Sequence, residues 1–180
     1  MDTFNYITIP KKPKALEGSD FRTISLMSHG MKDLLKIILD RNEKKLEAEI
    51  SENQSGSRPG KGTREGIFNL RIIIQRYLEV QKPVIICVID YEKAFDHAYR
   101  DRIMQYLDHI DMDCTDKRVM EKLYWQQTAT VRFGNKYSEF FPIKRGMRQG
   151  CALSPKLFNL YTEKIFNESD LTWMYYWWSE

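Results

Sequence analysis

The sequence predicts a single α/β domain in which helices pack on a small sheet. Residues 84–89 form an unbroken apolar run rich in β-branched side chains, directly after Pro83, which is typical of a strand buried on both faces. Several other stretches repeat apolar residues every three or four positions, as amphipathic helices do. Alternating residues on both sides of Gly134-Asn135 predict a β-hairpin. A length of 180 residues, with 42% hydrophobic and 29% charged content, fits one globular core.

The same patterns predict the remaining elements. Weak alternation in residues 1–25 predicts an edge strand that leads into a basic loop. Ser28 is a candidate N-cap for a helix that ends near Ile50. A second helix, over about 63–80, has apolar residues around much of its circumference, so we expect it to be mostly buried. The other expected helices are one after Asp96 that carries Ile103 and Ile110, one at about 117–127, and one opened by Ser154 and Pro155.

Composition argues against several classes of protein. The net charge is only +3, which does not by itself indicate a nucleic-acid binder. The three cysteines lie far apart without a C-x-x-C pair, so neither a zinc site nor a disulfide framework is indicated, and Cys87 is interpreted as a small buried hydrophobe. The sequence opens without a signal peptide and has no apolar run of about 18 residues. We therefore expect an intracellular protein of the nucleus or cytoplasm that is neither secreted nor bound to a membrane.

Asp90 is the first candidate functional residue. It ends the predicted buried strand, at the place where open α/β sheets bind ligands. A buried carboxylate needs a partner or a cation, and Mg²⁺ prefers one or two carboxylates together with substrate phosphates. The alternative, from this segment alone, is an ordinary hydrogen-bonded or helix-capping aspartate.

A glycine-rich loop at 51–66 is the second candidate. It contains four glycines together with Arg58, Lys61 and Arg64. This composition fits a solvated linker. The alternative is a loop whose amides and guanidinium approach phosphates, which glycine permits by removing side-chain bulk.

A second basic loop, at 144–155, is the third candidate. Arg145 and Arg148 are placed to hold phosphates, and Gln149 and Gly150 to lie close to a flat substrate such as a base pair. An ordinary cationic turn is the alternative. An acidic metal candidate between two cationic loops is what nucleotidyl or phosphoryl transfer requires. The G-x-x-x-x-G-K-[ST] phosphate-binding loop does not occur, which argues against an unrelated phosphotransferase.

Four stretches together resemble a known family. Val-Ile-Asp-Tyr-Glu-Lys-Ala-Phe-Asp at 88–96 and Arg-Gly-Met-Arg-Gln-Gly-Cys-Ala-Leu-Ser-Pro-Lys-Leu-Phe-Asn at 145–159 resemble the first two palm motifs of reverse transcriptases. Phe-Arg-Thr-Ile-Ser-Leu-Met-Ser at 21–28 and Asn-Gln-Ser-Gly-Ser-Arg-Pro-Gly-Lys-Gly-Thr-Arg-Glu at 53–65 resemble the two fingers motifs that precede them. Their order and spacing are those of non-LTR (LINE-type) retrotransposon enzymes, and the resemblance covers residues from about 15 to 167.

The resemblance implies a fold and an activity. The fold would be the fingers and partial palm of a right-hand polymerase, with helices packed on a small, largely antiparallel sheet. Residues 1–82 would form a fingers-like region and residues 83–180 a partial palm with a fingers hairpin at about 129–141, in one reverse-transcriptase-like domain without a thumb. The activity would be RNA-directed DNA synthesis, with an RNA template, a DNA primer, deoxynucleoside triphosphates and Mg²⁺ or Mn²⁺.

The resemblance also implies roles for single residues. Asp90 would be the catalytic, metal-binding aspartate, with the Tyr91 carbonyl as a further ligand. Phe95 would stack beneath the sugar of the incoming nucleotide, with a core aromatic as the alternative, and Asp96 would cap the following helix. Nucleotide-binding residues would be Arg58, Tyr91, Phe95, Gln149 and Gly150, and contacts to template or phosphates would come from Lys61, Arg145 and Arg148.

The chain departs from the family pattern after Phe166. The family has two adjacent aspartates in a Tyr-x-Asp-Asp hairpin, and this sequence has no Asp-Asp pair. It closes instead with an aromatic tail, which holds three of its four tryptophans. A truncated reading frame or an alternative end is the simplest interpretation, and the sheet edge beside residues 84–90 is expected to be open or covered by that tail. Ser57 is a smaller departure, at a position where the family usually has an aromatic residue.

Two hypotheses about function follow. In the first, the chain is part of an RNA-directed DNA polymerase that uses two metal ions. In the second, it is a catalytically inactive remnant with at most weak binding of nucleic acid or nucleotide, because Asp90 alone cannot hold two divalent ions.

Overall fold

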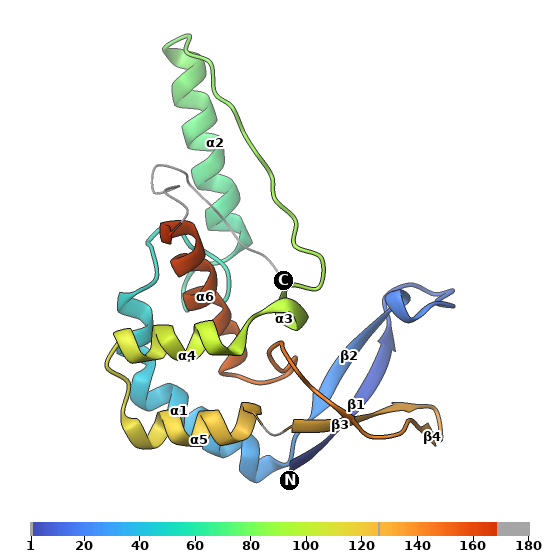
Figure 1. Ribbon diagram of the computed structural model, residues 1–180. Coiled ribbons are helices and arrows are strands. Elements are labelled where there is room, and N and C mark those ends of the chain that lie inside the picture. The colour runs from blue at the N-terminus through green and yellow to red at the C-terminus, as the bar shows by residue number, and fades with distance from the viewer. Residues whose placement is uncertain (1, 126, 169–180) are drawn as a thin grey trace.

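The computed structural model describes residues 2–125 and 127–168 (Figure 1). In chain order the elements are β1 (Asp2–Pro10), the 3-10 helix η1 (Gly18–Asp20), β2 (Phe21–Leu26), α1 (His29–Ala48), α2 (Thr63–Glu79), α3 (Ala94–His97), α4 (Arg100–His109), α5 (Cys114–Trp125), β3 (Gln127–Phe133), β4 (Lys136–Tyr137), β5 (Phe141–Pro142) and α6 (Ser154–Glu168). The fold is the predicted mixture of helices with a small sheet. Each predicted helix is present with nearly the expected bounds.

The sheet is mixed and has the strand order β2-β1-β3-β4, with β5 also paired to β3. β1 runs antiparallel to β2 and parallel to β3, with Asn5 opposite both Leu26 and Thr130. The predicted hairpin forms, with Arg132 opposite Tyr137 across the turn. β1 was expected at an edge, and this was wrong because β2, which the weak alternation did not reveal, pairs on its other side.

The core lies among the helices rather than on the sheet. α1, α4, α5 and α6 enclose a continuous group of buried apolar side chains, and Figure 1 shows these helices gathered on one side of the sheet. Its fully buried members include Leu46, Leu107, Met120 and Leu160. The predicted N-cap of α1 is confirmed, because the Ser28 hydroxyl accepts a hydrogen bond from the Met31 amide at 3.3 Å.

Residues 84–89 do not form the predicted buried strand. The segment is extended, belongs to no strand and descends from the far end of α2 toward α3 (Figure 1). Ile85 and Val88 are 95% and 86% exposed, and Cys87, predicted to be buried, is exposed as well. The physical reason is pairing: a strand needs hydrogen-bonded neighbours, and the strands of the described sheet pair among themselves.

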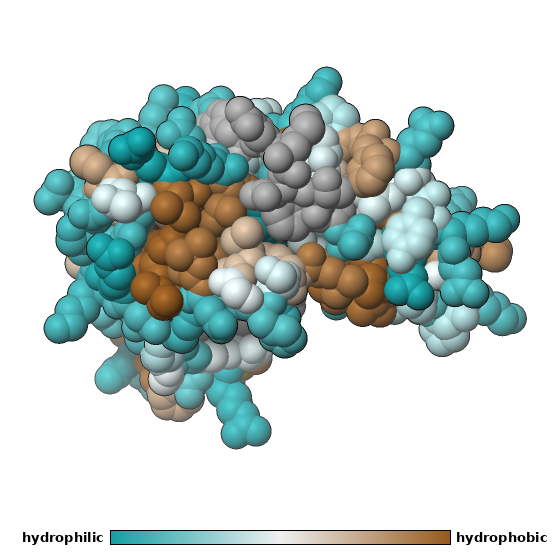
Figure 2. Space-filling model, turned by 90° about the horizontal axis from the view of Figure 1, so that it is seen from below, coloured by the Kyte–Doolittle hydropathy of each residue, from teal (hydrophilic) through white to brown (hydrophobic). Residues whose placement is uncertain are grey.

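The helix α2 forms where predicted but is not buried. It has no buried residue, and Phe68 and Leu78 are 63% and 68% exposed. Figure 1 shows it projecting away from the other helices. Apolar side chains also reach the surface elsewhere, and the view from below in Figure 2 shows a hydrophobic patch bordered by hydrophilic residues. The sequence indicated how apolar α2 is, but not which element would cover it.

Candidate active site

The loop at 144–150 is held between the sheet and α3 by backbone hydrogen bonds. The Ser25 amide of β2 donates to the Gln149 carbonyl at 3.1 Å. The amides of Gly146 and Met147 donate to the carbonyls of Ala98 and Phe95 at 2.9 and 2.8 Å. These bonds bring together three of the four resembling stretches, which lie far apart in the sequence.

Two glycines make this close approach possible. Gly146 has φ +95°, and a Cβ atom there would lie 2.8 Å from the Asp96 carbonyl oxygen. Gly150 has φ +94°, with its virtual Cβ 3.4 Å from a methyl carbon of Ile24. A side chain at either position would therefore be strained, and at Gly146 it would also separate the loop from α3.

Arg100 is the main residue of this region that sequence reasoning missed. It is 8% exposed, and its guanidinium donates to the carbonyls of Gly146 at 3.0 Å and Ile143 at 2.9 Å. It also donates to the carbonyls of Tyr124 and Arg145. The sequence contains one sign of this role. A cation at the first position of a helix is disfavoured by the helix dipole, which indicates that Arg100 is held there by contacts outside the helix.

Arg148 lies inside the protein rather than on the loop surface. Its side chain is 2% exposed, donates to the Leu123 carbonyl, and lies 5.4 Å from the centre of the Tyr124 ring. In this conformation it joins the loop to α5. Its predicted contact with a template or phosphate stays a prediction. Arg145, three residues earlier on the same loop, is exposed.

Asp96 is a half-buried carboxylate at the centre of this region. Burial raises its pKa, while Lys93, His97, a hydrogen bond from Gln149 and Lys11 act in the opposite direction. It does not cap the following helix as predicted, because α4 begins after Tyr99 without a side-chain cap. Its backbone position in the short helix α3 directs it to Gln149 instead.

The aromatic residue Phe95 packs in the protein in this structure. Its ring stacks on that of Phe158 in α6 with the centroids 4.8 Å apart, and both border the helical core. Burial raises the pKa of Tyr91, and the electrostatic effect of Tyr161 in α6 raises it further. The nucleotide-stacking role of Phe95 stays a prediction.

Asp90 lies on the exposed segment between residues 84–89 and α3. Within residues 2–125 and 127–168, no three histidine, cysteine or acidic side chains come together as a metal site would require. The described residues therefore do not fit a complete Mg²⁺ or Mn²⁺ centre, and Asp90 with the Tyr91 carbonyl would be an incomplete set of ligands.

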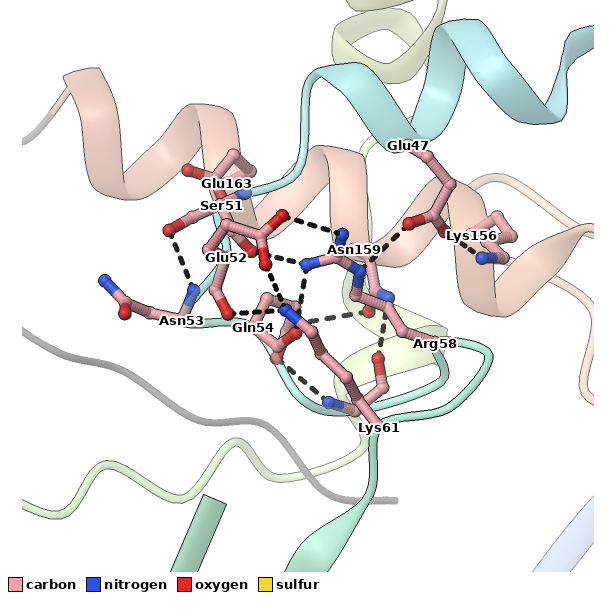
Figure 3. Close-up of polar contacts among 11 residues, drawn as sticks. Glu47, Ser51, Glu52, Asn53, Gln54, Arg58, Lys61, Lys156, Asn159 and Glu163 are labelled. Carbon is pink, nitrogen blue, oxygen red and sulfur yellow. Dashed lines mark hydrogen bonds and ion pairs between the residues drawn. The ribbon is translucent and has the colours of Figure 1, made fainter. Parts of the chain in front are cut away.

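The cations of the loop at 51–62 face acidic residues of the protein itself (Figure 3). Arg58 is bound to Glu47 at 2.9 Å and to the Ser51 carbonyl at 2.7 Å, and it is mostly buried. Lys61 is paired with Glu52 at 2.5 Å. Arg58 thereby fixes the loop to the end of α1, and the Ser51 amide fixes it to α6 by donating to Glu163 at 3.1 Å.

A buried ion-pair group stabilises that arrangement. Glu47 binds both Arg58 and Lys156, each of which is 8% exposed. Burial alone would raise the pKa of Glu47, but the hydrogen bonds from Lys156 and Arg58 lower it below its usual value. On the other side of the loop, the Asn159 side chain donates to the Gly56 carbonyl at 2.9 Å.

The structure thus brings some of the predicted site residues together and separates others. Gln149 lies beside Asp96, and Arg100 binds the Arg145 carbonyl. Phe95 contacts the same loop through its backbone, and Gly150 packs against Ile24 of β2. Arg58 and Lys61 belong to the other polar network. Among the described residues, no helix combines the length and apolar character needed to cross a lipid bilayer.

The sequence of this chain matches a known protein family. The profile of the family "Reverse transcriptase (RNA-dependent DNA polymerase)" matches residues 9–177. The chain belongs to the reverse transcriptase family. The sequence resemblance is therefore confirmed, and the reverse transcriptase motifs at 88–96 and 145–159 are the stretches that the structure brings into contact at Phe95 and Met147.

Relatives of this reverse transcriptase chain come from transposable elements. It is 26% identical over 165 residues to the transposon TX1 uncharacterized 149 kDa protein of Xenopus laevis, which covers 86% of the chain. It is 29% identical to the Pol polyprotein of the type-1 retrotransposable element R2 of Popillia japonica and 27% identical to the probable RNA-directed DNA polymerase from transposon BS of Drosophila melanogaster, each over 87% of the chain. The matched regions make up only 12%, 22% and 17% of these three relatives.

Proposed function

We propose that this chain is the part of an RNA-directed DNA polymerase that positions the template and the incoming nucleotide. Family membership and the names of the relatives from R2 and transposon BS support this function. One structural observation supports it most: the loop at 144–150 is built against α3 and β2, so that Gln149 lies beside Asp96 with the exposed Arg145 on the same loop.

The proposed division of the chain follows from this arrangement. Residues 1–82 and the hairpin at about 129–141 correspond to the fingers, and the rest of 83–180 to a partial palm. β1 and β3 pair in register from Asp2 opposite Gln127 to Ile7 opposite Arg132, which supports assigning the hairpin to the N-terminal region.

Within the described residues, Asp90 has no group of further acidic, histidine or cysteine ligands around it. Mg²⁺ or Mn²⁺, when bound in such an enzyme, supplies positive charge at the reacting phosphate oxygens. Asp90 is the described residue that we assign as a ligand, and two-metal chemistry requires further carboxylates beside it. We therefore expect the chain by itself to bind a primer–template without extending it.

The binding role is tested by exchanging one exposed cation. Arg145→Gln should weaken binding of a fluorescent RNA–DNA hybrid and lower the slope of log affinity against log salt by about one, as expected for one lost phosphate contact. Arg118→Gln, an equal charge change at an exposed position of α5, is the matched control and should leave the slope unchanged.

Fluorescence anisotropy at several salt concentrations measures both variants. Equal losses from Arg145→Gln and Arg118→Gln would show that binding follows net charge alone, and would contradict the assignment of the loop at 144–150 as the template-facing surface.

A further inference from the structure

Backbone contacts hold Gln149 and Asp96 beside each other. The Ser25 amide of β2 donates to the Gln149 carbonyl at 3.1 Å. On the same loop, Gly146 approaches α3 so closely that a Cβ atom there would lie 2.8 Å from the Asp96 carbonyl oxygen. The loop at 144–150 is therefore fixed to the sheet near Gln149 and to α3 near Asp96, and the places of both residues are set by the backbone.

The backbone does not set the orientation of the Gln149 side-chain amide. The terminal torsion of a glutamine is broad and roughly two-fold, so the amide can turn over and exchange its oxygen Oε1 with its nitrogen Nε2. The two orientations present opposite groups to a bound molecule, because Oε1 accepts a hydrogen bond whereas Nε2 donates one. A binding site that uses this amide therefore needs a neighbouring group that selects one orientation.

The Asp96 carboxylate is such a neighbour. It is half-buried and accepts a hydrogen bond from the Gln149 side chain. The charges of Lys93, His97 and Lys11 favour its ionised form, against the effect of burial. An ionised carboxylate accepts hydrogen bonds and cannot donate them, so Gln149 has to use Nε2 in this contact.

We propose that Asp96 is a positioning residue that holds Nε2 of Gln149 toward itself and leaves Oε1 to accept a hydrogen bond from the substrate. The substrate group would be a donor, that is, a hydroxyl or amino group of the nucleotide or nucleic acid at the loop at 144–150. The identity of this substrate rests on the proposed function, whereas the orientation of the amide is a property of the chain alone.

Asparagine at position 96 would fill nearly the same space but would not select an orientation. Its side chain both donates and accepts, so it can pair with Gln149 in either orientation of the amide. If the two orientations are equally populated, the fraction of molecules that presents Oε1 is halved. The affinity for a ligand that needs Oε1 then falls about twofold, because apparent affinity scales with the competent fraction.

NMR spectroscopy of the free chain tests the orientation without a ligand. The Gln149 side-chain amide signals are identified by their loss in Gln149→Glu. In the wild-type chain, we expect the Gln149 amide nitrogen and the Asp96 carboxyl carbon to shift with the same pH midpoint. This midpoint should lie above the ordinary aspartate pKa of 3.8, because burial raises the pKa of Asp96.

Two neighbouring groups are controlled in this titration. Repeating it in His97→Gln removes any contribution from the charge of His97. Tyr6 of β1 interacts electrostatically with Asp96, but burial raises the pKa of this tyrosine above its ordinary value of 10, so it stays neutral over the range. Different midpoints for Gln149 and Asp96, or Gln149 signals that do not respond to pH, would overturn the proposal.

The variant Asp96→Asn gives the matched comparison. Its Gln149 amide signals should lose the pH dependence, whereas Asp101→Asn, at an exposed position in the first turn of α4, should retain it. A pH dependence in Asp96→Asn equal to that of the wild-type chain would also overturn the proposal.

Binding of the fluorescent RNA–DNA hybrid tests the consequence for the substrate. Removal of one negative charge by itself tightens binding of nucleic acid, and Asp101→Asn measures this effect. Asp96→Asn should instead weaken binding, by about twofold. In a Gln149→Ala background, Asp96→Asn should no longer weaken binding, because its effect passes through the Gln149 amide.

The outcomes of the binding experiment are distinct. Binding that tightens in Asp96→Asn as much as in Asp101→Asn would overturn the proposal. An equal loss with and without the Gln149 side chain would also overturn it, since it would show that Asp96 acts on the fold rather than on the amide. A wild-type chain that does not bind the hybrid would contradict the proposed function, and the NMR titration would still decide the role of Asp96.

Discussion

Two acidic residues illustrate how local environment sets a carboxylate's role in this reverse transcriptase chain. Glu47 is held by two mostly buried cations, Arg58 and Lys156, and its pKa is lowered despite burial. Asp96 has no ion pair as close among the described residues, and burial raises its pKa. A carboxylate kept partly buried at an energetic cost is a feature of functional sites, whereas one between two cations has a structural role.

Glu47→Gln should lower the free energy of unfolding by about 2–3 kcal/mol, because two buried cations lose their charged partner. This loss is smaller than that expected for a fully buried ion pair, because the Glu47 side chain is partly exposed. The folded-state pKa of Glu47 is lowered, so its contribution is present above the unfolded value of 4.5 and is lost as the pH falls through the lower folded value. Urea unfolding at neutral pH and near pH 3 should show the variant's deficit shrinking in acid.

The control for that experiment is the exposed ion pair of Lys36 and Asp40 on the same helix. Asp40→Asn should change stability by no more than about 0.5 kcal/mol. A Glu47→Gln deficit that is equally small, or that persists unchanged in acid, would show that the Glu47 group does not stabilise the loop at 51–62.

At the scale of elements, the helices were predictable and the packing partners were not. Ser28 as a cap, the three- and four-residue periodicity and Ser154-Pro155 gave the helices with nearly the right bounds. The prediction that α2 and residues 84–89 are buried was wrong. An apolar pattern favours burial, but it does not identify the element against which the segment packs.

Within the site, the glycines and loop residues could be predicted from their resemblance to a motif, but the residue that holds the loop could not. Arg100 binds backbone carbonyls. Because every residue has a backbone carbonyl, residue types do not show which carbonyls an arginine will bind. The same holds for the inward position of Arg148, since a loop arginine by itself suggests an exposed cation. Only the fold shows which arginines are structural.

Arg100→Met should lower the free energy of unfolding by about 2–3 kcal/mol, because several buried carbonyls lose their donor. It should also make the loop at 144–150 more accessible, so that trypsin cuts faster after Lys144 and Arg145. Arg102→Met, an exposed arginine on the same helix, is the control and should have little effect on either measurement. Unchanged tryptic cleavage in Arg100→Met would show that this side chain does not position the loop.

At the scale of the whole molecule, the described chain is a helical core with a small sheet on one side and the exposed helix α2 projecting away from it (Figure 1). The sheet does not include the segment that leads to Asp90, and no group of metal ligands assembles around that residue within the described part of the chain. The region that matches this chain makes up at most 22% of the length of the relatives from TX1, R2 and BS. Under the proposed function, we expect catalysis to require carboxylates in addition to Asp90.

Nucleotide incorporation by a fusion protein tests the central claim most directly. The chain is joined to the polypeptide that follows the matched region in the R2 protein of Popillia japonica, and incorporation is measured on an RNA template with a DNA primer and Mg²⁺. We predict incorporation by the fusion, its loss in Asp90→Asn, its retention in the neighbouring control Glu92→Gln, and none by the unfused chain. Incorporation that survives Asp90→Asn, or equal incorporation by the unfused chain, would contradict the assignment of Asp90 as one ligand of an otherwise incomplete metal centre.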